Sequence, residues 1–406
     1  MQYVLGNMLN GGGINPDGLS LDLQFAADKT LTSRRGPRPD FTRGSTGTFV
    51  GSNSLIQTAA VNEPRFDHTS AGVCRGLLIE EGRTNLYQQS EVFNDSFWTK
   101  TRSSISSNAT TAPDGTLTAD KLVEDTTASN THTISSAVTP PATAHTLSVF
   151  AKKGERTWIV LRLGGTNTFF NLDDGTIAAG SVNSPTITNF GNGWYRCAVT
   201  SSSGTQGQFW LATNSTTTSY TGDGTSGLFI WGAQLEAGSF PTSYIPTTTG
   251  TLARSADVCS ITGGDFTSFY NQSEGTMLTN AFTPASGDRT VLAADDNTAN
   301  EMIRLRTEGT NPFFKVTDGG SELVAIDAGT VSANTSFKLI GAYKLDDFAS
   351  SINGGAAGTD TSGTTPTVDR MRIGAGQGGN TMCGCVAAIR YYKKRLPNAK
   401  LVTLTT

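Results

Sequence analysis

One stretch, residues 228–246, limits the possible folds of this chain more than any other. Its first half, LFIWGAQL, is a short apolar run that passes into alternating small, polar and apolar residues, a pattern typical of a buried β-strand. Its second half turns at Gly238 and Pro241. We interpret the stretch as the closing strand of a β-sandwich.

Several short strands are predicted ahead of this stretch. Clusters of Gly, Ser, Thr, Asn and Asp separate them, and long windows with helical periodicity are missing. The predicted strands are residues 146–151, 158–163, 168–172, 193–200 and 208–212. Strands of this length and spacing are typical of an antiparallel sandwich or jelly roll.

Three pieces of sequence resemble one known module. QLEAGSFPTSYIPT (residues 234–247) looks like the end of the jelly-roll module of bacteriophage head-spike, head-fibre and tail-fibre proteins. GLLIEEGRTNL (residues 76–86) and NGWYR (residues 192–196) fit the same module, so that the resemblance covers roughly residues 38–258. It implies a virion surface appendage, and it leaves open whether the appendage belongs to the head or the tail. By the same resemblance we expect a homo-oligomer, a trimer in most phage fibres.

Residues 262–406 contain a second series of predicted strands and no Trp. Their last part, residues 386–401, resembles the end of laminin-G-like or concanavalin-like sandwiches, in which a final strand leads into a short helix after a residue such as Pro397. The predicted fold class is therefore all-β, with tandem antiparallel sandwiches. We expect an N-terminal arm and small β attachment region at 1–86, a jelly roll at 87–258 and a laminin-G/concanavalin-like sandwich at 262–406.

Charge and hydropathy exclude several classes of partner. A formal net charge of −4 on 406 residues gives no basic face for nucleic acid. No window has the apolar length of a membrane span, and the first residues do not form a secretory signal. We therefore expect assembly in a host cytoplasm into a virion. The glycine-rich residues 1–13 are expected to dock on a neighbouring subunit or on other virion proteins.

No metal or cofactor is expected from the sequence. The five cysteines mostly occupy apolar, strand-like surroundings and are interpreted as buried thiols. Cys383 and Cys385 are the exception to consider, but His68, His132 and His145 are more than two hundred positions upstream, so ligand spacing for zinc is absent.

Catalytic patterns are also weak. Glu80 and Glu81 are adjacent, so in a strand they point to opposite faces and cannot flank one glycosidic bond. We expect them instead to form ion pairs with Arg83 or Arg65. The three histidines are widely scattered, and the predicted protein is not an enzyme. The alternative in that class is a polysaccharide-degrading tailspike.

The five tryptophans all lie between residues 98 and 231. Most are expected to fill the core, because each buries a large apolar area. Trp158 and Trp210 are the candidates for stacking on sugar rings, since the apolar neighbours of each can point the other way along its strand. The functional hypothesis is thus a non-enzymatic virion protein whose sandwich domains bind host surface glycan weakly and multivalently. A purely architectural decoration or connector is the alternative.

Overall fold

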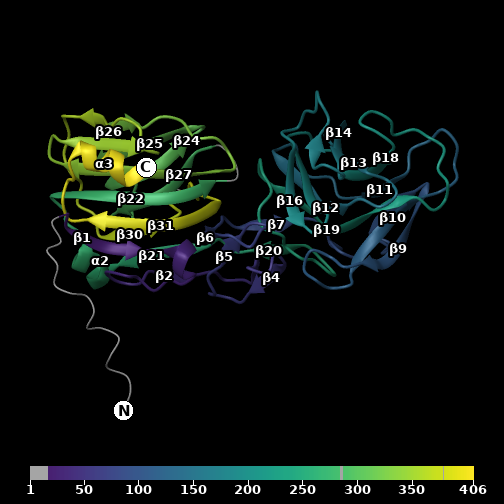
Figure 1. Ribbon diagram of the computed structural model, residues 1–406, viewed down its shortest axis with the longest axis horizontal. Coiled ribbons are helices and arrows are strands. Elements are labelled where there is room, and N and C mark those ends of the chain that lie inside the picture. Colours follow the sequence, from purple (N-terminus) through teal and green to yellow (C-terminus); the bar gives the residue numbers. More distant parts are fainter. Residues whose placement is uncertain (1–16, 284–286, 378) are drawn as a thin grey trace, which may run out of the picture. The chain divides into compact units, whose positions relative to one another are not determined.

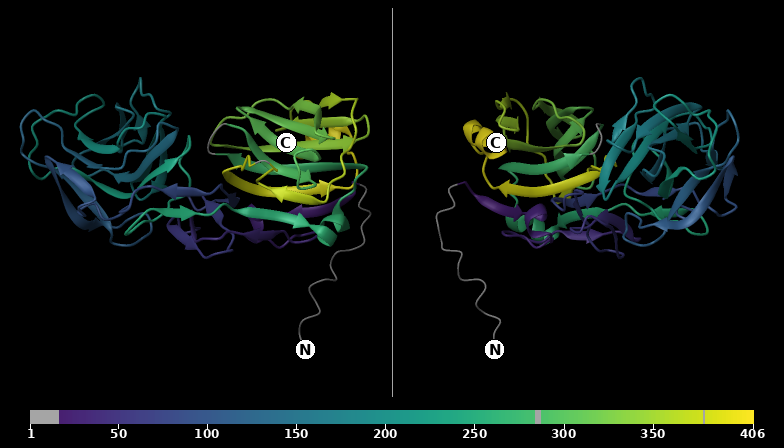
Figure 2. Two further views of the ribbon diagram at one scale, coloured as in Figure 1. Left: turned by 180° about the vertical axis from the view of Figure 1, so that it is seen from behind. Right: turned by 45° about the vertical axis from the view of Figure 1, so that its right-hand side comes forward.

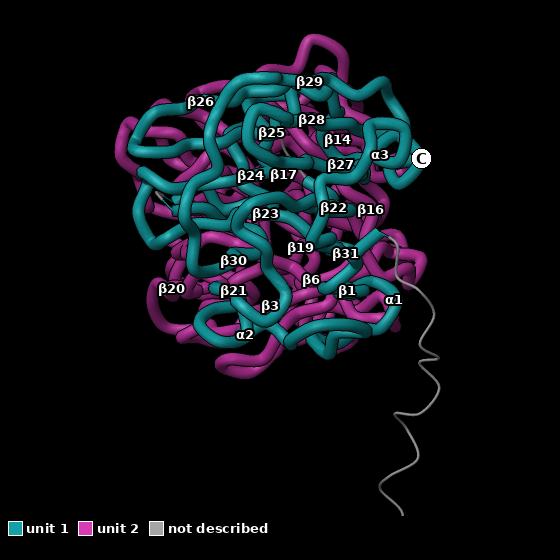
Figure 3. Tube along the Cα trace, turned by 90° about the vertical axis from the view of Figure 1, so that its left-hand side faces the viewer, with its two compact units in different colours: residues 1–40, 258–406 teal, residues 41–257 magenta. Residues whose placement is uncertain are grey.

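The computed structural model describes residues 17–283, 287–377 and 379–406. Within these residues the chain forms two compact units, residues 17–40 with 258–406 (unit 1) and residues 41–257 (unit 2), which Figure 3 colours separately. The region predicted as one attachment segment is thus divided between the two units at residue 40. The predicted docking arm at residues 1–13 lies outside the described residues.

Unit 2 begins with short paired strands. β3 (Gly47–Val50) pairs with β4 (Ile56–Ala59), and β5 (Phe66–His68) pairs with β6 (Cys74–Ile79). β7 (Arg83–Asn85) pairs with β20 (Leu252–Arg254), which comes from the far end of the unit. All three pairs are antiparallel.

The main body of unit 2 consists of two six-stranded antiparallel sheets. The β12 sheet has the order β16-β17-β12-β19-β10-β9 and the β13 sheet the order β15-β14-β13-β18-β11-β8. The strands are β8 (Trp98–Thr101), β9 (Ser103–Thr110), β10 (Ala119–Glu124), β11 (Thr133–Ser136), β12 (His145–Lys152), β13 (Trp158–Leu163), β14 (Thr166–Asn171), β15 (Thr176–Ile177), β16 (Thr186–Gly191), β17 (Trp194–Ser201), β18 (Gln208–Ala212) and β19 (Gly227–Ala237).

The order of these strands is that of a jelly roll. The eight strands β10 to β14 and β17 to β19 can be numbered 1 to 8 in chain order. One sheet then has the strand order 6-3-8-1 and the other the order 5-4-7-2. The predicted strand at the start of residues 228–246 is β19, which lies between β12 and β10 in its sheet. The predicted all-β class with antiparallel sandwiches is confirmed.

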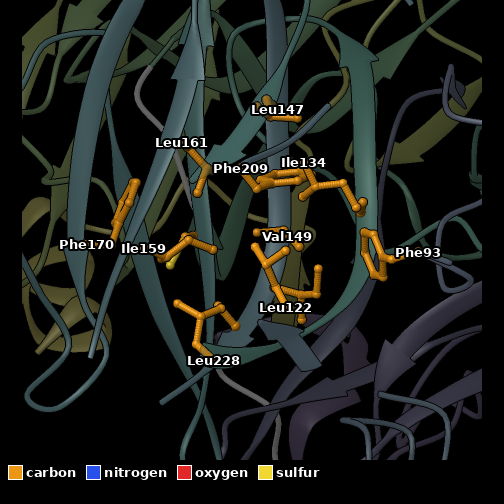
Figure 4. Close-up of a cluster of buried hydrophobic side chains, with 14 of the residues drawn as sticks. Phe93, Leu122, Ile134, Leu147, Val149, Ile159, Leu161, Phe170, Phe209 and Leu228 are labelled. Carbon is orange, nitrogen blue, oxygen red and sulfur yellow. The ribbon is translucent and has the colours of Figure 1, made fainter. Parts of the chain in front are cut away.

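The core of unit 2 lies between these two sheets. Figure 4 shows Leu147 and Val149 of β12 together with Ile159 and Leu161 of β13 and Phe209 of β18, all fully buried. Because alternate residues of each strand supply this core, the intervening residues point to the outer faces of the two sheets.

Unit 1 is a second sandwich. Its strands are β1 (Leu19–Leu23), β21 (Val258–Thr262), β22 (Glu274–Thr283), β23 (Arg289–Asp295), β24 (Met302–Glu308), β25 (Asn311–Asp318), β26 (Ser321–Asp327), β27 (Thr335–Lys344), β28 (Phe348–Ile352), β29 (Gly358–Asp360), β30 (Arg370–Ile373) and β31 (Gly384–Tyr392), with helices α1 (Phe25–Asp28), α2 (Gly263–Phe269) and α3 (Asn398–Thr405). β2 (Asp40–Thr42) crosses the boundary between the units. Figure 1 labels most of these elements.

Two sheets of unit 1 face each other. One has the order β29-β28-β27-β22-β31 with β1 on β31, and the other, the β24 sheet, has the order β21-β30-β23-β24-β25-β26. They pack closely, since a Cβ placed on Gly341 of β27 would lie 2.1 Å from the ring of Phe314 on β25. Helix α3 follows Pro397, as predicted, and is the yellow helix in Figure 2. It buries Leu401 against Leu278 and Ile340 on the outer face of the first sheet.

Candidate functional site

The candidate site is the outer face of the β13 sheet in unit 2. Strand β13 reads WIVLRL, and its residues Ile159, Leu161 and Leu163 are fully buried in the core. Because side chains alternate along a strand, Trp158 and Arg162 point to the opposite, outer face. Both are half-buried.

The neighbouring strand β18 brings the second predicted tryptophan to the same face. Phe209 and Leu211 are buried in the core, so Trp210 points outward, and it is half-buried like Trp158. In the register Trp210 lies opposite Val160, and Trp158 lies opposite Ala212. The two indoles are therefore diagonal neighbours on one face, with backbones about 7–8 Å apart. Figure 1 shows β13 and β18 side by side.

A third aromatic residue, which the sequence analysis did not single out, extends this face. Phe169 of β14 lies opposite Val160 on the side away from Trp210. Val160 shares this outer face and is nevertheless fully buried, so the side chains around it cover it. The centre of the face is thus apolar. The alternation in β14, with Phe170 buried and Phe169 half-buried, is the signal that could have identified it.

Planar polar groups border the aromatic residues. Arg162 lies opposite both Gln208 and Asn167, so these three form one row across the sheet. The Arg162 guanidinium carbon is 5.1 Å from the centre of the Trp210 ring, and its Nη1 donates a hydrogen bond to Asn167 Oδ1 at 2.7 Å. Trp210 Nε1 donates to Gln208 Oε1 at 2.7 Å. The row offers both donors and acceptors next to apolar rings.

The corresponding face of the β12 sheet is covered. Trp194, Trp231 and Tyr244 lie there at 2%, 1% and 3% exposure, packed with Ile56 of β4. Trp98, at 1% exposure, belongs to the core between the sheets. Three of the five tryptophans therefore have the packing role expected from the sequence. The two that remain partly exposed are the predicted pair, Trp158 and Trp210.

Glu80 and Glu81 of the motif at residues 76–86 belong to a separate cluster of ion pairs in unit 2. Arg65 lies 2.8 Å from Glu80 and 2.5 Å from Asp257, and Arg43 lies 3.2 Å from Asp257. Burial alone raises the pKa of the Glu80 carboxyl, but the charges of Arg254 and Arg65 and hydrogen bonds from Ser243 outweigh it and lower this pKa to about 2. Arg83 pairs with Glu81. The ion pairs predicted for Glu80 and Glu81 are confirmed, and the two carboxylates pair with different arginines.

Other residues of the motifs at 76–86 and 234–247 contact each other through hydrogen bonds and a cation–π interaction. Asn85 Nδ2 donates to the carbonyl oxygens of Ala233 and Ile245 at 3.1 and 2.9 Å, and the Leu235 N–H donates to Asn85 Oδ1 at 3.1 Å. The guanidinium of Arg83 lies over the Phe240 ring at 5.0 Å. The sequence pieces at residues 76–86 and 234–247 thus hold one another in place.

The three histidines have backbone partners in three separate places. His68 Nδ1 contacts the Val50 carbonyl oxygen at 3.0 Å, His132 Nδ1 that of Arg102 at 2.7 Å and His145 Nδ1 that of Thr143 at 2.8 Å. In the described part of the chain, no three His, Cys, Asp or Glu side chains are grouped to hold a metal ion. Four cysteines, including Cys383 and Cys385, are buried and Cys74 is half-buried.

A second polar network in unit 2 is centred on Glu124. The buried Glu124 carboxylate accepts hydrogen bonds from Arg156 Nε at 2.8 Å and from the Tyr220 hydroxyl at 2.8 Å. Burial opposes the ionisation of Glu124, but the hydrogen bonds from Arg156 and Tyr220 outweigh it and keep the pKa of this carboxyl below its usual value. A carboxylate held in this way stabilises the loop at Tyr220.

Among the described residues, no helix is long and apolar enough to cross a membrane.

No family model and no curated protein matches the sequence. Solved structures similar to part of the chain include the CBM40 domain of Ruminococcus gnavus IT-sialidase bound to α2,6-sialyllactose (TM-score 0.30, 15% identity, 34% of this chain and 85% of that one). Domain 4 of the arabinanase AbnA from Geobacillus stearothermophilus, in complex with arabinotriose, has a TM-score of 0.30 at 14% identity over 41% of this chain and 82% of that one.

The SAP-like pentraxin from Limulus polyphemus is a further example, with a TM-score of 0.26 at 10% identity over 33% of this chain and 70% of that one.

Proposed function

We propose that unit 2 binds saccharide on the outer face of its β13 sheet and catalyses no reaction. The observation that carries the proposal is the position of Trp158 and Trp210 as diagonal, half-buried neighbours on this face. The C–H faces of a sugar ring suit an indole, and the row of Arg162, Gln208 and Asn167 supplies donors and acceptors for hydroxyl groups.

A face of this kind binds each sugar weakly, so useful affinity requires several copies. We therefore propose a homo-oligomer, a trimer by the resemblance to phage fibres, exposed on a virion and directed at host surface glycan. The resemblance at residues 76–86, 192–196 and 234–247 supports this placement. Attachment to other virion proteins through the N-terminal region completes the proposal.

A glycan array with the recombinant chain, followed by calorimetric titration of the sugars that bind, tests the binding. Trp158→Ala and Trp210→Ala should each weaken binding about tenfold, because truncating an aromatic residue at the centre of an interface commonly costs more than about 1 kcal/mol. Phe229→Ala, which removes a half-buried aromatic residue from the β12 sheet, serves as the control and should leave binding unchanged. No binding at millimolar sugar would favour a purely architectural role.

Two further measurements test the rest of the proposal. Electron microscopy of particles carrying the chain should place it on the outside of a virion, and analytical ultracentrifugation should give a trimer. Release of reducing ends from a bound polysaccharide would contradict the non-enzymatic role.

A further inference from the structure

The outer face of the β24 sheet in unit 1 carries an unusual set of side chains. On β24, Ile303 and Leu305 are buried in the core, so Arg304 and Arg306 point outward. On β25, the Phe314 ring packs toward Gly341 of the facing sheet, which directs Phe313 and Lys315 outward. Three cations from two adjacent strands therefore share one face.

The register places like charges together. Arg304 lies directly opposite Lys315, and Arg306 lies two residues further along β24, opposite Phe313. Like charges in direct cross-strand register destabilise a sheet. These cations are also withdrawn from water, with side-chain exposures of 14% for Arg304, 8% for Arg306 and 9% for Lys315. The arrangement costs stability and requires compensation by anions.

Three carboxylates, those of Glu308, Glu322 and Asp288, contact these cations, but they serve the lysine better than the arginines. Lys315 Nζ lies 2.7 Å from Glu308 and 3.2 Å from Glu322. The carboxylate contacts of Arg304, with Glu322, and of Arg306, with Asp288, are both 3.5 Å long, beyond the usual 2.7–3.2 Å of a hydrogen bond.

In the described part of this face, two buried arginine nitrogens lack a hydrogen-bond acceptor. The Nε atoms of Arg304 and Arg306 are buried and have no hydrogen-bond partner among the described residues, although Arg306 Nε lies 3.3 Å from Glu308. The side chains of Glu322 and Asp288 are 41% and 63% exposed, so they can move aside at little cost. Burial, and then the charge of Arg306, lower the pKa of Arg304, as expected for crowded cations.

An aromatic ring lies beside these donors. Phe313 is half-buried on the same face, opposite Arg306, and Lys315 Nζ is 4.9 Å from the centre of its ring. A ligand that combines an oxyanion with an apolar ring face would match both features. A free inorganic anion would match only the cations.

We propose that this face binds a carboxylate-bearing saccharide, with the carboxylate between Arg304, Arg306 and Lys315 and a sugar ring on Phe313. Guanidinium groups bind carboxylates through charge-assisted, frequently bidentate hydrogen bonds, which the unfilled donors provide. The site lies in the other unit and selects for charge, so it is independent of the saccharide face of the β13 sheet.

Calorimetric titration of the full chain with tetragalacturonate, with a neutral galactose tetramer and with sodium sulfate tests the proposal. Tetragalacturonate should bind at least about tenfold more tightly than the neutral tetramer, as expected for charged hydrogen bonds, and its affinity should fall as salt increases. Equal binding of the two tetramers would overturn the proposal. Sulfate binding as tight as that of tetragalacturonate would also overturn it, because the site would then recognise only an anion.

Variants locate the binding. Arg306→Gln should weaken tetragalacturonate binding about tenfold or more, whereas Arg390→Gln, which removes one positive charge from β31 in the other sheet of unit 1, should not change it. If Arg306→Gln does not fold, Glu322→Gln decides the question. Removing this competing carboxylate should tighten binding about twofold to fivefold. Unchanged or weaker binding in a folded Glu322→Gln protein would refute the site.

A double variant separates this proposal from the one for unit 2. Trp158→Ala combined with Trp210→Ala should leave tetragalacturonate binding intact. If the double variant abolishes it, the acidic saccharide binds to the β13 sheet and the inference for unit 1 is wrong.

Discussion

The Arg65 guanidinium lies 2.8 Å from the Glu80 carboxylate, and both side chains are buried in unit 2. Glu80 belongs to the motif at residues 76–86, and its carboxylate also accepts hydrogen bonds from the N–H and hydroxyl of Ser243 at 2.7 and 2.6 Å. Ser243 belongs to the motif at residues 234–247. The two motifs therefore meet at one buried carboxylate. The ion pair and hydrogen bonds of this carboxylate stabilise the fold.

Glu80→Gln should destabilise the protein strongly. It leaves the buried Arg65 with Asp257 alone and removes the charge that Arg254 approaches at 3.5 Å. Removing one partner of a buried ion pair typically costs about 3–5 kcal/mol of unfolding free energy. Glu63→Gln is the matched control, because Glu63 is exposed and Gln can still accept the hydrogen bond from the Ala60 N–H, and it should cost under about 1 kcal/mol. Denaturant titration of both variants measures the difference, and equal losses would contradict the assigned role of Glu80.

The same carboxylate predicts how stability depends on pH. Its pKa is about 2 in the folded protein and about 4.5 in an unfolded chain. A lowered pKa means that the stabilisation is complete above about pH 4.5 and is lost as the pH falls toward 2, because the unfolded chain takes up the proton first. Denaturation midpoints between pH 6 and pH 2 should therefore decrease more steeply for the natural chain than for Glu80→Gln. Parallel curves would show that Glu80 does not carry this dependence.

The close packing of the two sheets in unit 1 gives a further prediction. Gly341 has no room for a side chain, since a Cβ would lie 2.1 Å from Phe314 Cδ2. Gly341→Ala should cost about 1–3 kcal/mol through overpacking. Gly264→Ala, at a position with no atom within 4 Å of the added Cβ, is the control and should be close to neutral. Thermal unfolding monitored by circular dichroism distinguishes the two, and similar melting temperatures would argue against the packing described.

The sequence allows the strands to be predicted much better than the sites. β13 and β18 occur at the predicted residues, because their alternation and the polar clusters between strands are local signals. The outward position of Trp158 and Trp210 follows from the same alternation. Cross-strand register is not a local property. For this reason Phe169 beside Val160, Arg162 beside Gln208 and the facing cations Arg304 and Lys315 could be found only in the structure.

The polar row of the β13 sheet gives the last prediction. Arg162→Lys keeps the positive charge but loses the planar group that lies 5.1 Å from the Trp210 ring and donates to Asn167. Since Lys is a point charge without this fixed geometry, binding of the saccharide selected by the array should weaken about threefold to tenfold. The unfolding free energy should change by no more than about 0.5 kcal/mol, because the residue is on the outer face.

Calorimetric titration and denaturation of the same preparation separate the two effects of Arg162→Lys. Lys152→Ala, which removes a half-buried lysine from β12, is the control for a general effect of charge. An unchanged affinity for Arg162→Lys together with a loss of binding for Trp210→Ala would limit the site to the aromatic residues. Unchanged affinity for both variants would contradict the proposed site, because Trp210 and the adjacent Arg162 guanidinium are two of the groups assigned to bind the saccharide.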